Sequence, residues 1–321
     1  MAELRKDYIL DQYVIIAQER AKRPSQFSRS PPTPSSDKDC PLCPHNEHMI
    51  PGVLEQVGDG RGGWLMRAIP NKFAAVGQEG SAALSTHDPL FVHGLALGEH
   101  EVIIDTPHHD MEFEDLSVEH IERLLQFYAH RARVVESKPH VRYTALFKNR
   151  GEEAGASISH SHAQIIGLSV FPPAVARLFD RAYDYALRNE SCPFCDVIRR
   201  EKHSKRLIFI NKTFVCIAPF ASRFPFEAWI LPLRHVPAMD KLRKEEFSDF
   251  AHMLRKVLRR LGTLGVPPYN LVFYNDERQG MFHFHVQVLP RLAKWAGFEH
   301  EVSVPINPVP PESASSFYRE G

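Results

Sequence analysis

The stretch at residues 147–164 reads FKNRGEEAGASISHSHAQ, and a related stretch at residues 273–287 reads FYNDERQGMFHFHVQ. Each leads from a strand-like segment through a loop into a His-x-His-x-Gln motif. Each is also preceded, in the same order, by a Cys-x-x-Cys pair, a strand ending at a histidine and a helical pattern. These repeated signals predict an internal duplication, in which one structural unit occurs twice.

Hydrophobic periodicity predicts one long helix in each unit, over residues 116–135 and 244–261. Apolar residues share one face of the first helix at Ile121, Leu124, Leu125 and Tyr128, and of the second at Phe247, Phe250, Leu254 and Val257. Strands are predicted over 7–18, 64–69, 102–104 and 228–231. The fold class is therefore α+β, with antiparallel sheets each covered by a long helix, in an N-terminal unit at 1–170 and a C-terminal unit at 171–321.

Composition excludes several classes of protein. The 321 residues are 43% hydrophobic, which is enough for a sizeable core, and 39 basic residues balance 39 acidic ones. This balance argues against nonspecific nucleic-acid binding and against attraction to acidic membranes. The N-terminus lacks the apolar segment of a signal peptide, and no run approaches the length of a membrane span. We expect a cytoplasmic protein without nucleic-acid or membrane partners.

Four of the five cysteines form two Cys-x-x-Cys pairs, Cys40/Cys43 and Cys192/Cys195. A redox pair or plain core cysteines are the alternative to a metal site. Metal binding is favoured because histidines follow both pairs in a similar order, and Cys2His2 is a common zinc set. The expected ligands are Cys40, Cys43, His109 and one histidine of the first His-x-His, then Cys192, Cys195, His235 and His283. His108 beside His109 leaves open which of the two turns inward.

The first His-x-His-x-Gln is the candidate centre for chemistry. A neutral histidine can attack an α-phosphorus, and Gln164 can donate to a phosphoryl oxygen as charge develops. The preceding loop contains glycines, and its hydroxyls include Ser157, which suits a phosphate. The rival pair, His285 and Gln287, follows a loop with one glycine and no hydroxyl. The first motif is therefore the predicted active one.

These motifs resemble the histidine-triad superfamily, and specifically its galactose-1-phosphate uridylyltransferase branch, from Tyr13 to about Glu312. The fold is then two duplicated histidine-triad-like units. The resemblance implies that His160 completes the first zinc site, that His162 becomes nucleotidylated, and that the enzyme is a homodimer. It also implies substrate contacts, with the phosphates at Asn149, Gly155, Ser157 and Gln164, with the nucleoside diphosphate at Arg20, Arg23 and Asn71, and with the sugar at Lys294, Phe298 and Glu299.

Three features depart from the family pattern. Ser161 stands where the uridylyltransferases usually carry proline, a variant similar to the branch with plant ADP-glucose phosphorylase. Phe298 stands where a sugar-binding tyrosine is common. The second site resembles Cys2His2 zinc rather than an iron site of carboxylate and histidine. These departures concern the nucleobase and the acceptor rather than the nucleophile.

The leading hypothesis is a ping-pong nucleotidyltransferase of galactose metabolism, in which UDP-glucose passes uridylyl to a hexose 1-phosphate through His162. The first alternative is an ADP-glucose phosphorylase, which would transfer adenylyl to inorganic phosphate. An alternative of another class is a non-catalytic, zinc-stabilised nucleotide-binding module. A zinc-ribbon nucleic-acid binder would place basic clusters by the cysteines, but Asp37, Asp39 and Glu47 flank the first pair.

Overall fold

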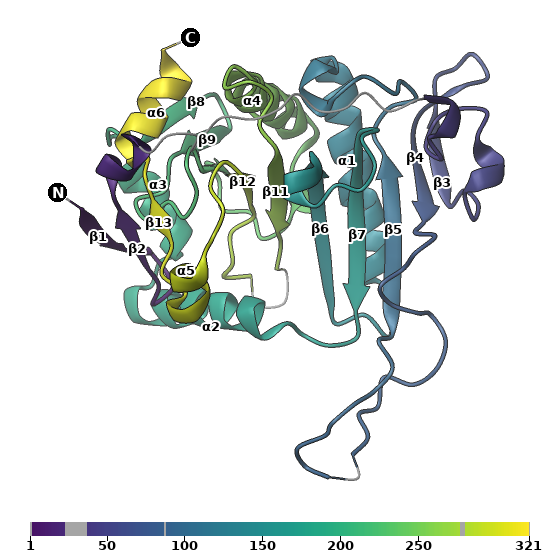
Figure 1. Cartoon of the computed structure of the whole chain (residues 1–321), viewed down its shortest axis with the longest axis horizontal. Coiled ribbons are helices and arrows are strands. Elements are labelled where there is room, and N and C mark those ends of the chain that lie inside the picture. The colour runs from purple at the N-terminus through teal and green to yellow at the C-terminus, as the bar shows by residue number, and fades with distance from the viewer. Residues whose placement is uncertain (1, 23–36, 87, 277–279, 321) are drawn as a thin grey trace.

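The computed structural model describes residues 2–22, 37–86, 88–276 and 280–320. Within them, ten strands form one continuous sheet whose neighbouring strands are all antiparallel (Figure 1). From edge to edge these are β3 (Glu55–Gly58), β4 (Trp64–Pro70), β5 (Gly98–Ile104), β7 (His162–Leu168), β6 (Tyr143–Arg150), β11 (Tyr269–Tyr274), β12 (His285–Pro290), β10 (Ala228–Pro232), β9 (Phe214–Ile217) and β8 (Leu207–Ile210). The predicted α+β class is confirmed.

The strand order confirms the duplication. Reading outward from the centre, β6-β7-β5-β4 in the first half matches β11-β12-β10-β9 in the second. The two halves meet where β6 pairs with β11, with Phe147 opposite Val272 and Asn149 opposite Asn270. The sequence suggested a sheet in each unit, whereas the structure joins them edge to edge. This pairing satisfies backbone N–H and C=O groups that two separate sheets would leave exposed at their edges.

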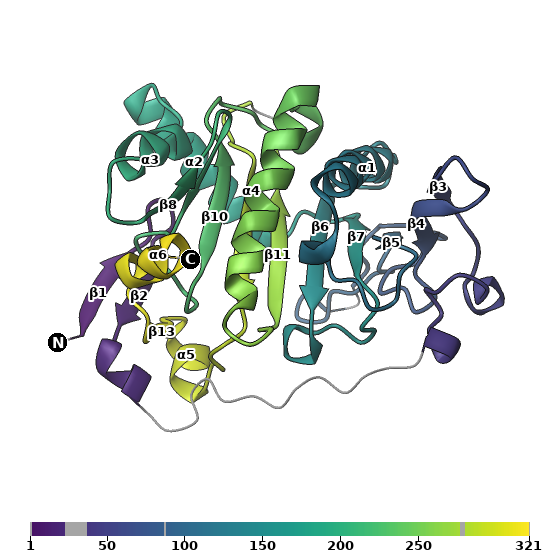
Figure 2. The ribbon, with the colours of Figure 1, turned by 90° about the horizontal axis from the view of Figure 1, so that it is seen from above.

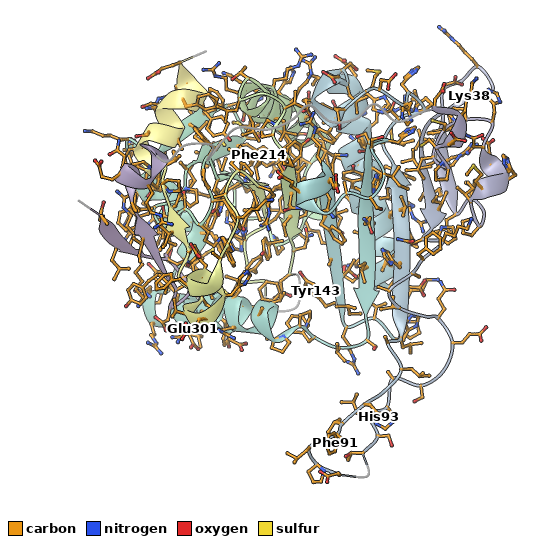
Figure 3. The ribbon with its side chains drawn as sticks, in the orientation of Figure 1. Lys38, Phe91, His93, Tyr143, Phe214 and Glu301 are labelled. Atoms are coloured by element: carbon orange, nitrogen blue, oxygen red, sulfur yellow. The ribbon has the colours of Figure 1, made fainter. Side chains whose placement is uncertain are left out.

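Two long helices, α1 (Val118–Glu136) and α4 (Lys244–Gly262), pack side by side on one face of the sheet (Figure 2). Ser117 caps α1 by accepting a hydrogen bond from the backbone N–H of His120 at 3.2 Å. All eight apolar residues predicted to face inward on these helices are buried. They form one core with the sheet, and one buried member of that core is Phe214, labelled in Figure 3.

The opposite face is covered unevenly. In the second half, α2 (Pro173–Asn189) and α3 (Pro193–Glu201) pack over β9 and β10, with Phe179, Phe194 and Trp229 in the shared apolar cluster. In the first half, a smaller cluster around Cys40 and Cys43 covers β4 and β5. The central strands β6, β7 and β11 carry half-buried side chains on this face. It is therefore the face on which a ligand can approach the histidine motif.

Residues 3–16 contribute to a small second sheet at the C-terminal side of the molecule. It contains β1 (Glu3–Lys6), β2 (Tyr13–Ile16) and β13 (Ile306–Asn307). The strand predicted over 7–18 is therefore too long. Asp7 instead forms a turn, because its carboxylate accepts the backbone N–H groups of Ile9 and Leu10 at 2.9 and 2.7 Å.

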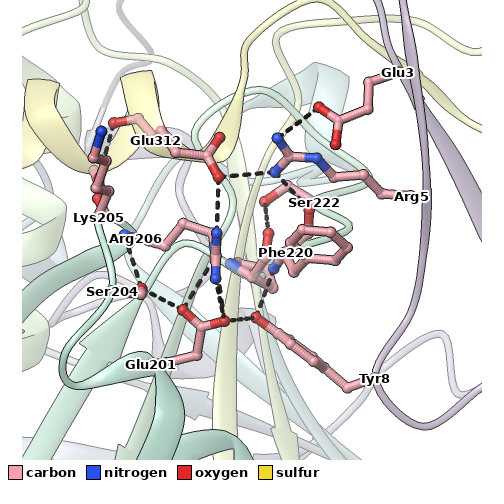
Figure 4. Close-up of polar contacts among 12 residues, drawn as sticks. Glu3, Arg5, Tyr8, Glu201, Ser204, Lys205, Arg206, Phe220, Ser222 and Glu312 are labelled. Carbon is pink, nitrogen blue, oxygen red and sulfur yellow. Dashed lines mark hydrogen bonds and ion pairs between the residues drawn. The ribbon is translucent and has the colours of Figure 1, made fainter.

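A polar network anchors this small sheet to the C-terminal half (Figure 4). Glu312, in α6 (Pro311–Arg319), accepts hydrogen bonds from Arg5 at 3.0 Å and Arg206 at 2.9 Å. Tyr8 donates to Glu201 at 2.6 Å. The remaining short elements are α5 (Gly297–Val302) and the 3₁₀ turns η1 (Gln18–Lys22), η2 (Asp37–Asp39), η3 (Glu47–Met49), η4 (Phe113–Asp115), η5 (Glu152–Ala154) and η6 (Met239–Lys241).

Between β4 and β5 the chain forms an arm that extends away from the body (Figure 1). Ser85 and His93 exchange backbone hydrogen bonds of 2.8 and 3.0 Å across it. Figure 3 shows Phe91 and His93 on this arm, clear of the sheet. Its apolar side chains are exposed, 84% for Leu90 and 72% for Phe91. None of the helices in the described part of the chain is both long and apolar enough for a membrane span.

Candidate active site and metal groups

His162 is the first residue of β7, and β5 and β6 flank this strand. Its Nδ1 lies 2.8 Å from the carbonyl oxygen of His160. A carbonyl oxygen only accepts, so Nδ1 carries the ring proton and Nε2 keeps its lone pair. Among the described residues, none makes a hydrogen bond with this Nε2. Burial lowers the pKa of His162, and the charge of Lys148 lowers that pKa further. The ring therefore suits a neutral nucleophile.

A buried ion pair supports the backbone at His162. Lys148 Nζ lies 2.7 Å from Asp105 Oδ2, 2.8 Å from Ser161 Oγ and 3.1 Å from the carbonyl oxygen of His162. Tyr128 donates its hydroxyl to the other oxygen of Asp105. Lys148 is 1% exposed and Asp105 is fully buried. Each charge thus has several close partners, as burial of an ion requires.

Gln164 is held by a histidine of the neighbouring strand. The backbone N–H of Ala75 donates to Nδ1 of His100 at 3.1 Å, so Nε2 of the neutral ring carries the proton. This Nε2 lies 2.9 Å from Oε1 of Gln164 and 3.0 Å from Nδ2 of Asn71. Since a protonated Nε2 donates, its hydrogen-bond partner is the oxygen of Gln164. The NH2 group of Gln164 is then left to donate elsewhere.

The loop between β6 and β7 contains the residues that the resemblance assigned to phosphate. Gly155 has φ 87°, a left-handed conformation that glycine adopts without strain. A Cβ at Gly155 would lie 3.7 Å from Nδ2 of Asn149, so the loop passes close to that amide. The N–H of Gly155 donates to the carbonyl of Glu152 at 2.8 Å. Ser157 is exposed, so its hydroxyl is accessible from solvent.

The first predicted metal group assembles as expected. The ligand atoms of Cys40, Cys43, His109 and His160 all lie within 4.8 Å of one another. His109, rather than its neighbour His108, belongs to this group. His160 precedes β7 and donates from Nε2 to the carbonyl of Thr106 at 2.7 Å. Its Nδ1 therefore carries a lone pair, which points at the sulfurs of Cys40 and Cys43, 3.6 and 3.4 Å away.

The second group repeats this arrangement with Cys192, Cys195, His235 and His283, again within 4.8 Å of one another. Nε2 of His235 lies 3.0 Å from the carbonyl of Gly280, and Nε2 of His283 lies 2.9 Å from that of Pro232. Both rings therefore direct the Nδ1 lone pair towards Cys195, at 3.5 Å each. Two sulfurs and two imidazole lone pairs around one point are a donor set that suits a metal cation.

Comparison with known proteins agrees with this geometry. The family model described as the N-terminal domain of galactose-1-phosphate uridyl transferase matches residues 1–172, more than half of the chain. The chain belongs to the galactose-1-phosphate uridylyltransferase family. The ADP-glucose phosphorylase of Arabidopsis thaliana is 32% identical over 99% of this chain and 92% of its own length. A galactose-1-phosphate uridylyltransferase of Thermotoga maritima is 27% identical over 100% and 98%.

A solved structure extends this similarity to the whole fold. The crystal structure of an ADP-glucose phosphorylase from Arabidopsis thaliana with bound ADP-glucose has a TM-score of 0.85 to this chain at 30% identity. The match covers 100% of this chain and 99% of that one. The relatives named here are enzymes of nucleotidyl transfer, and the chain is an enzyme of this class.

This family member carries a second His-x-His-x-Gln, but its histidine is enclosed. His285 is fully buried, with ring centroids of Phe194 at 4.7 Å and Tyr274 at 5.0 Å. Nε2 of Gln287 lies 3.2 Å from Nε2 of His285, the ring nitrogen that corresponds to the nucleophilic Nε2 of His162. Burial lowers the pKa of His285 to about 3. Because α2 and α3 cover this half of the sheet, His285 has neither a free nitrogen nor an approach for substrate.

The sugar-recognition segment expected for the family reaches the first half. Lys294 Nζ lies 3.6 Å from Oε1 of Glu153 in the β6–β7 loop. Phe298 is 46% exposed, whereas Glu299 is 7% exposed. One oxygen of Glu299 accepts the backbone N–H of Ala296 at 3.0 Å, which caps α5. Glu299 therefore has a structural partner within its own helix.

Arg20 does not join the other site residues in this chain. It lies in η1, directly after β2, and Figure 1 shows β2 on the opposite side of the molecule from β5 and β7. Arg23 lies outside the described residues. Asn71, by contrast, contacts His100 beside Gln164. The structure thus gathers most of the expected nucleotide contacts around β7 and leaves Arg20 apart.

Several residues of the site were not predicted from sequence. His100 occupies a position in β5 that faces Gln164, and its strand alternation was the available signal. Lys148 and Asp105 carry charges within apolar segments, which is rare without a partner. Asn270 lies in the second unit and bonds Asn149 at 2.8 Å. Its contact depends on the β6–β11 pairing, for which no local sequence signal exists.

Proposed function

We propose that the enzyme transfers a nucleotidyl group from a nucleoside diphosphate sugar through a covalent nucleotidyl-His162. The observation that carries this proposal is the state of the His162 ring, whose Nδ1–H donates to the carbonyl of His160 while no described residue bonds Nε2. In this proposal, residues 1–170 contain the unit with the chemistry and residues 171–321 the second unit, with residues 3–16 packed against the second unit.

In the first step, Nε2 of His162 attacks the α-phosphorus of the donor. The bond from this phosphorus to the bridging oxygen breaks, and its electron pair leaves with the sugar 1-phosphate. The imidazole gains positive charge as the bond to phosphorus forms. The carbonyl of His160 stabilises that charge through Nδ1–H. In the second step, an acceptor phosphate oxygen attacks the same phosphorus and the electron pair of the N–P bond returns to Nε2.

Amide and hydroxyl groups around His162 supply the electrostatic part of the mechanism. The NH2 of Gln164 is free because His100 holds its oxygen, and it donates to a non-bridging oxygen of the α-phosphate. Asn149 and Ser157 donate to the phosphates from β6 and the following loop, and Gly155 lets that loop pass close to them. Asn71 contacts the nucleoside from beside His100.

The two Cys2His2 groups fit zinc by their donor atoms. Zinc in these closed sets is structural, because four protein ligands leave no position for substrate. In the first group it would hold His160, two residues before the nucleophile, and thus the start of β7. In the second it would join Cys192 and Cys195 at α3 to His235 and His283.

We propose ADP-glucose as the donor and inorganic phosphate as the acceptor, with ADP and glucose 1-phosphate as products. The identity to the Arabidopsis ADP-glucose phosphorylase and the match to its complex with ADP-glucose support this choice. Uridylyl transfer from UDP-glucose to galactose 1-phosphate is the second candidate, supported by the Thermotoga relative.

The deciding experiment is intact mass spectrometry of the protein mixed with ADP-glucose or UDP-glucose, beside His162→Asn. We expect an added AMP mass with ADP-glucose in the wild type alone, and its loss on adding phosphate. An adduct with UDP-glucose that galactose 1-phosphate removes and inorganic phosphate does not would transfer the proposal to the second candidate. Without an adduct from either donor, a non-catalytic nucleotide-binding module would become the better description.

We further propose a homodimer. The exposed apolar side chains of the arm, among them Leu90 and Phe91, support a contact between copies. Arg20 follows β2, on the opposite side of the molecule from β7, so a contact between Arg20 and the donor would come from a second copy (Figure 1). Light scattering should give twice the chain mass for the wild type, and Leu90→Asp with Phe91→Asp should shift it towards the monomer. A monomeric wild type would refute the proposal.

A further inference from the structure

Asn270 of the second unit touches the active-site loop of the first. The two strands β6 and β11 place Asn270 directly opposite Asn149. Asn270 Nδ2 lies 2.8 Å from Oδ1 of Asn149 and 2.8 Å from the carbonyl oxygen of Ala154. Both contacts reach from the second unit to the first, one to Asn149 of β6 and one to Ala154 in the loop between β6 and β7.

The backbone decides which way both amides point. The carbonyl of Ala154 can only accept, so Asn270 must face it with its NH2 group. The same NH2 group donates to Asn149, which must therefore present its oxygen to Asn270. The NH2 group of Asn149 is left on the other side, where Gly155 approaches it. The Ala154 carbonyl therefore fixes the orientation of both amides.

The asparagine pair borders open space rather than the core. A pocket of about 290 Å³ on the uncovered face of the sheet is lined by Asn149 and Asn270, together with Phe147, Val272 and Leu289. Asn149 and Asn270 are both half-buried, so a ligand in the pocket can reach the amide of Asn149. The NH2 group of Asn149 is oriented before a ligand arrives, so it can donate to a phosphate without first having to reorient.

We propose that Asn270 is a positioning residue for the reaction at His162, acting through Asn149. It holds the amide of Asn149 by its oxygen, so that the NH2 group faces the phosphates of the donor. This inference rests on the proposed function. It gives the second unit an indirect part in the chemistry, through Asn149, although its own His285 is enclosed.

The test is the rate of His162 nucleotidylation and the steady-state kcat and KM of Asn270→Ala, Asn270→Ser and Asn270→Asp. The alanine and serine variants should lose about tenfold in rate, mainly in kcat, because Asn149 becomes free to turn its oxygen to the phosphate. The aspartate variant keeps the shape but cannot donate, so it should lose more. It also keeps the test valid should Asn270→Ala fold poorly.

A double-mutant cycle separates positioning from a general structural effect. In an Asn149→Ala background, replacing Asn270 should change the rate less than about twofold, because the amide through which Asn270 acts is gone. Asn211→Ala is the matched control, since Asn211 bonds the carbonyl of Asp249 within the second unit at 2.8 Å, and its rate should equal the wild type. Wild-type rates in the Asn270 variants, or losses that multiply in the cycle, would overturn the inference. A wild type that forms no adduct would instead reject the proposed function.

Discussion

Lys148 Nζ lies 2.7 Å from Asp105 Oδ2 in the interior of the first unit, and the same ammonium donates to the carbonyl of His162. Removing either ion would leave the other one buried without an opposite charge and without water. Lys148→Met should therefore lower the free energy of unfolding by about 3–5 kcal/mol, measured by urea denaturation. The adduct at His162 should also form more slowly, because the backbone there loses a hydrogen-bond donor.

The double variant Lys148→Met with Asp105→Asn should recover part of that stability, since no buried charge remains. Lys138→Met is the control on an exposed lysine and should change the free energy of unfolding by less than about 0.5 kcal/mol. Equal destabilisation by Lys148→Met and the double variant would mean that the unpaired charge of Asp105 is not the main cause of the lost stability.

His285→Phe should retain the nucleotidyl adduct. The ring of His285 already lies among aromatic rings, with Phe194 at 4.7 Å and Trp229 at 5.5 Å, and it has no approach for substrate. Stability should fall by no more than about 3 kcal/mol from overpacking and lost hydrogen bonds. His162→Phe, the same change at the matching position, should abolish the adduct in intact mass spectra. Loss of the adduct in His285→Phe would point to two cooperating histidines.

Metal content should be two zinc ions per chain by elemental analysis, because two complete donor sets exist. Cys40→Ser with Cys43→Ser should leave one ion and abolish the adduct, since His160 loses the partner that orients it ahead of His162. Cys192→Ser with Cys195→Ser should also leave one ion and lower the melting temperature. Below that temperature, the variant with both substitutions in this second pair should still form the adduct. If the Cys192/Cys195 variant lost the adduct and the Cys40/Cys43 variant kept it, the second metal group rather than the first would support the active site.

Glu312 makes the stability depend on acid pH. Burial alone would raise the pKa of Glu312, but hydrogen bonds from Arg5 and Arg206 outweigh it, so its pKa is lowered (Figure 4). A carboxyl with a lowered folded-state pKa stabilises the protein above its unfolded pKa of about 4.5. This contribution disappears as pH falls below that value through the folded pKa.

Glu312→Gln should therefore lower the free energy of unfolding at neutral pH by on the order of 1 kcal/mol, since the carboxylate is partly exposed. The difference from wild type should shrink as pH falls from about 5 to 3. Denaturation curves at four pH values would measure it. A constant difference across that range would contradict the ion-pair account.

Much of this protein is determined by local sequence. Ile121 and Leu125 share a helical face because their spacing matches 3.6 residues per turn, and α1 forms where this periodicity predicts it. The two Cys-x-x-Cys pairs and their histidines also recur in the same order, which predicts both donor sets. A short spacing brings the two cysteines of each pair together whatever the rest of the fold does, whereas the fold brings the histidines to them.

The tertiary structure decides which of the two His-x-His-x-Gln motifs is accessible to substrate. His162 and His285 have similar sequence neighbours, but α2 and α3 cover only the second half of the sheet. The pairing of β6 with β11 likewise brings Asn270 to Asn149, and Lys148 of β6 meets Asp105, which directly follows β5, in the interior. These contacts join residues far apart in the chain. They depend on which surfaces exclude water together, and no local periodicity encodes that choice.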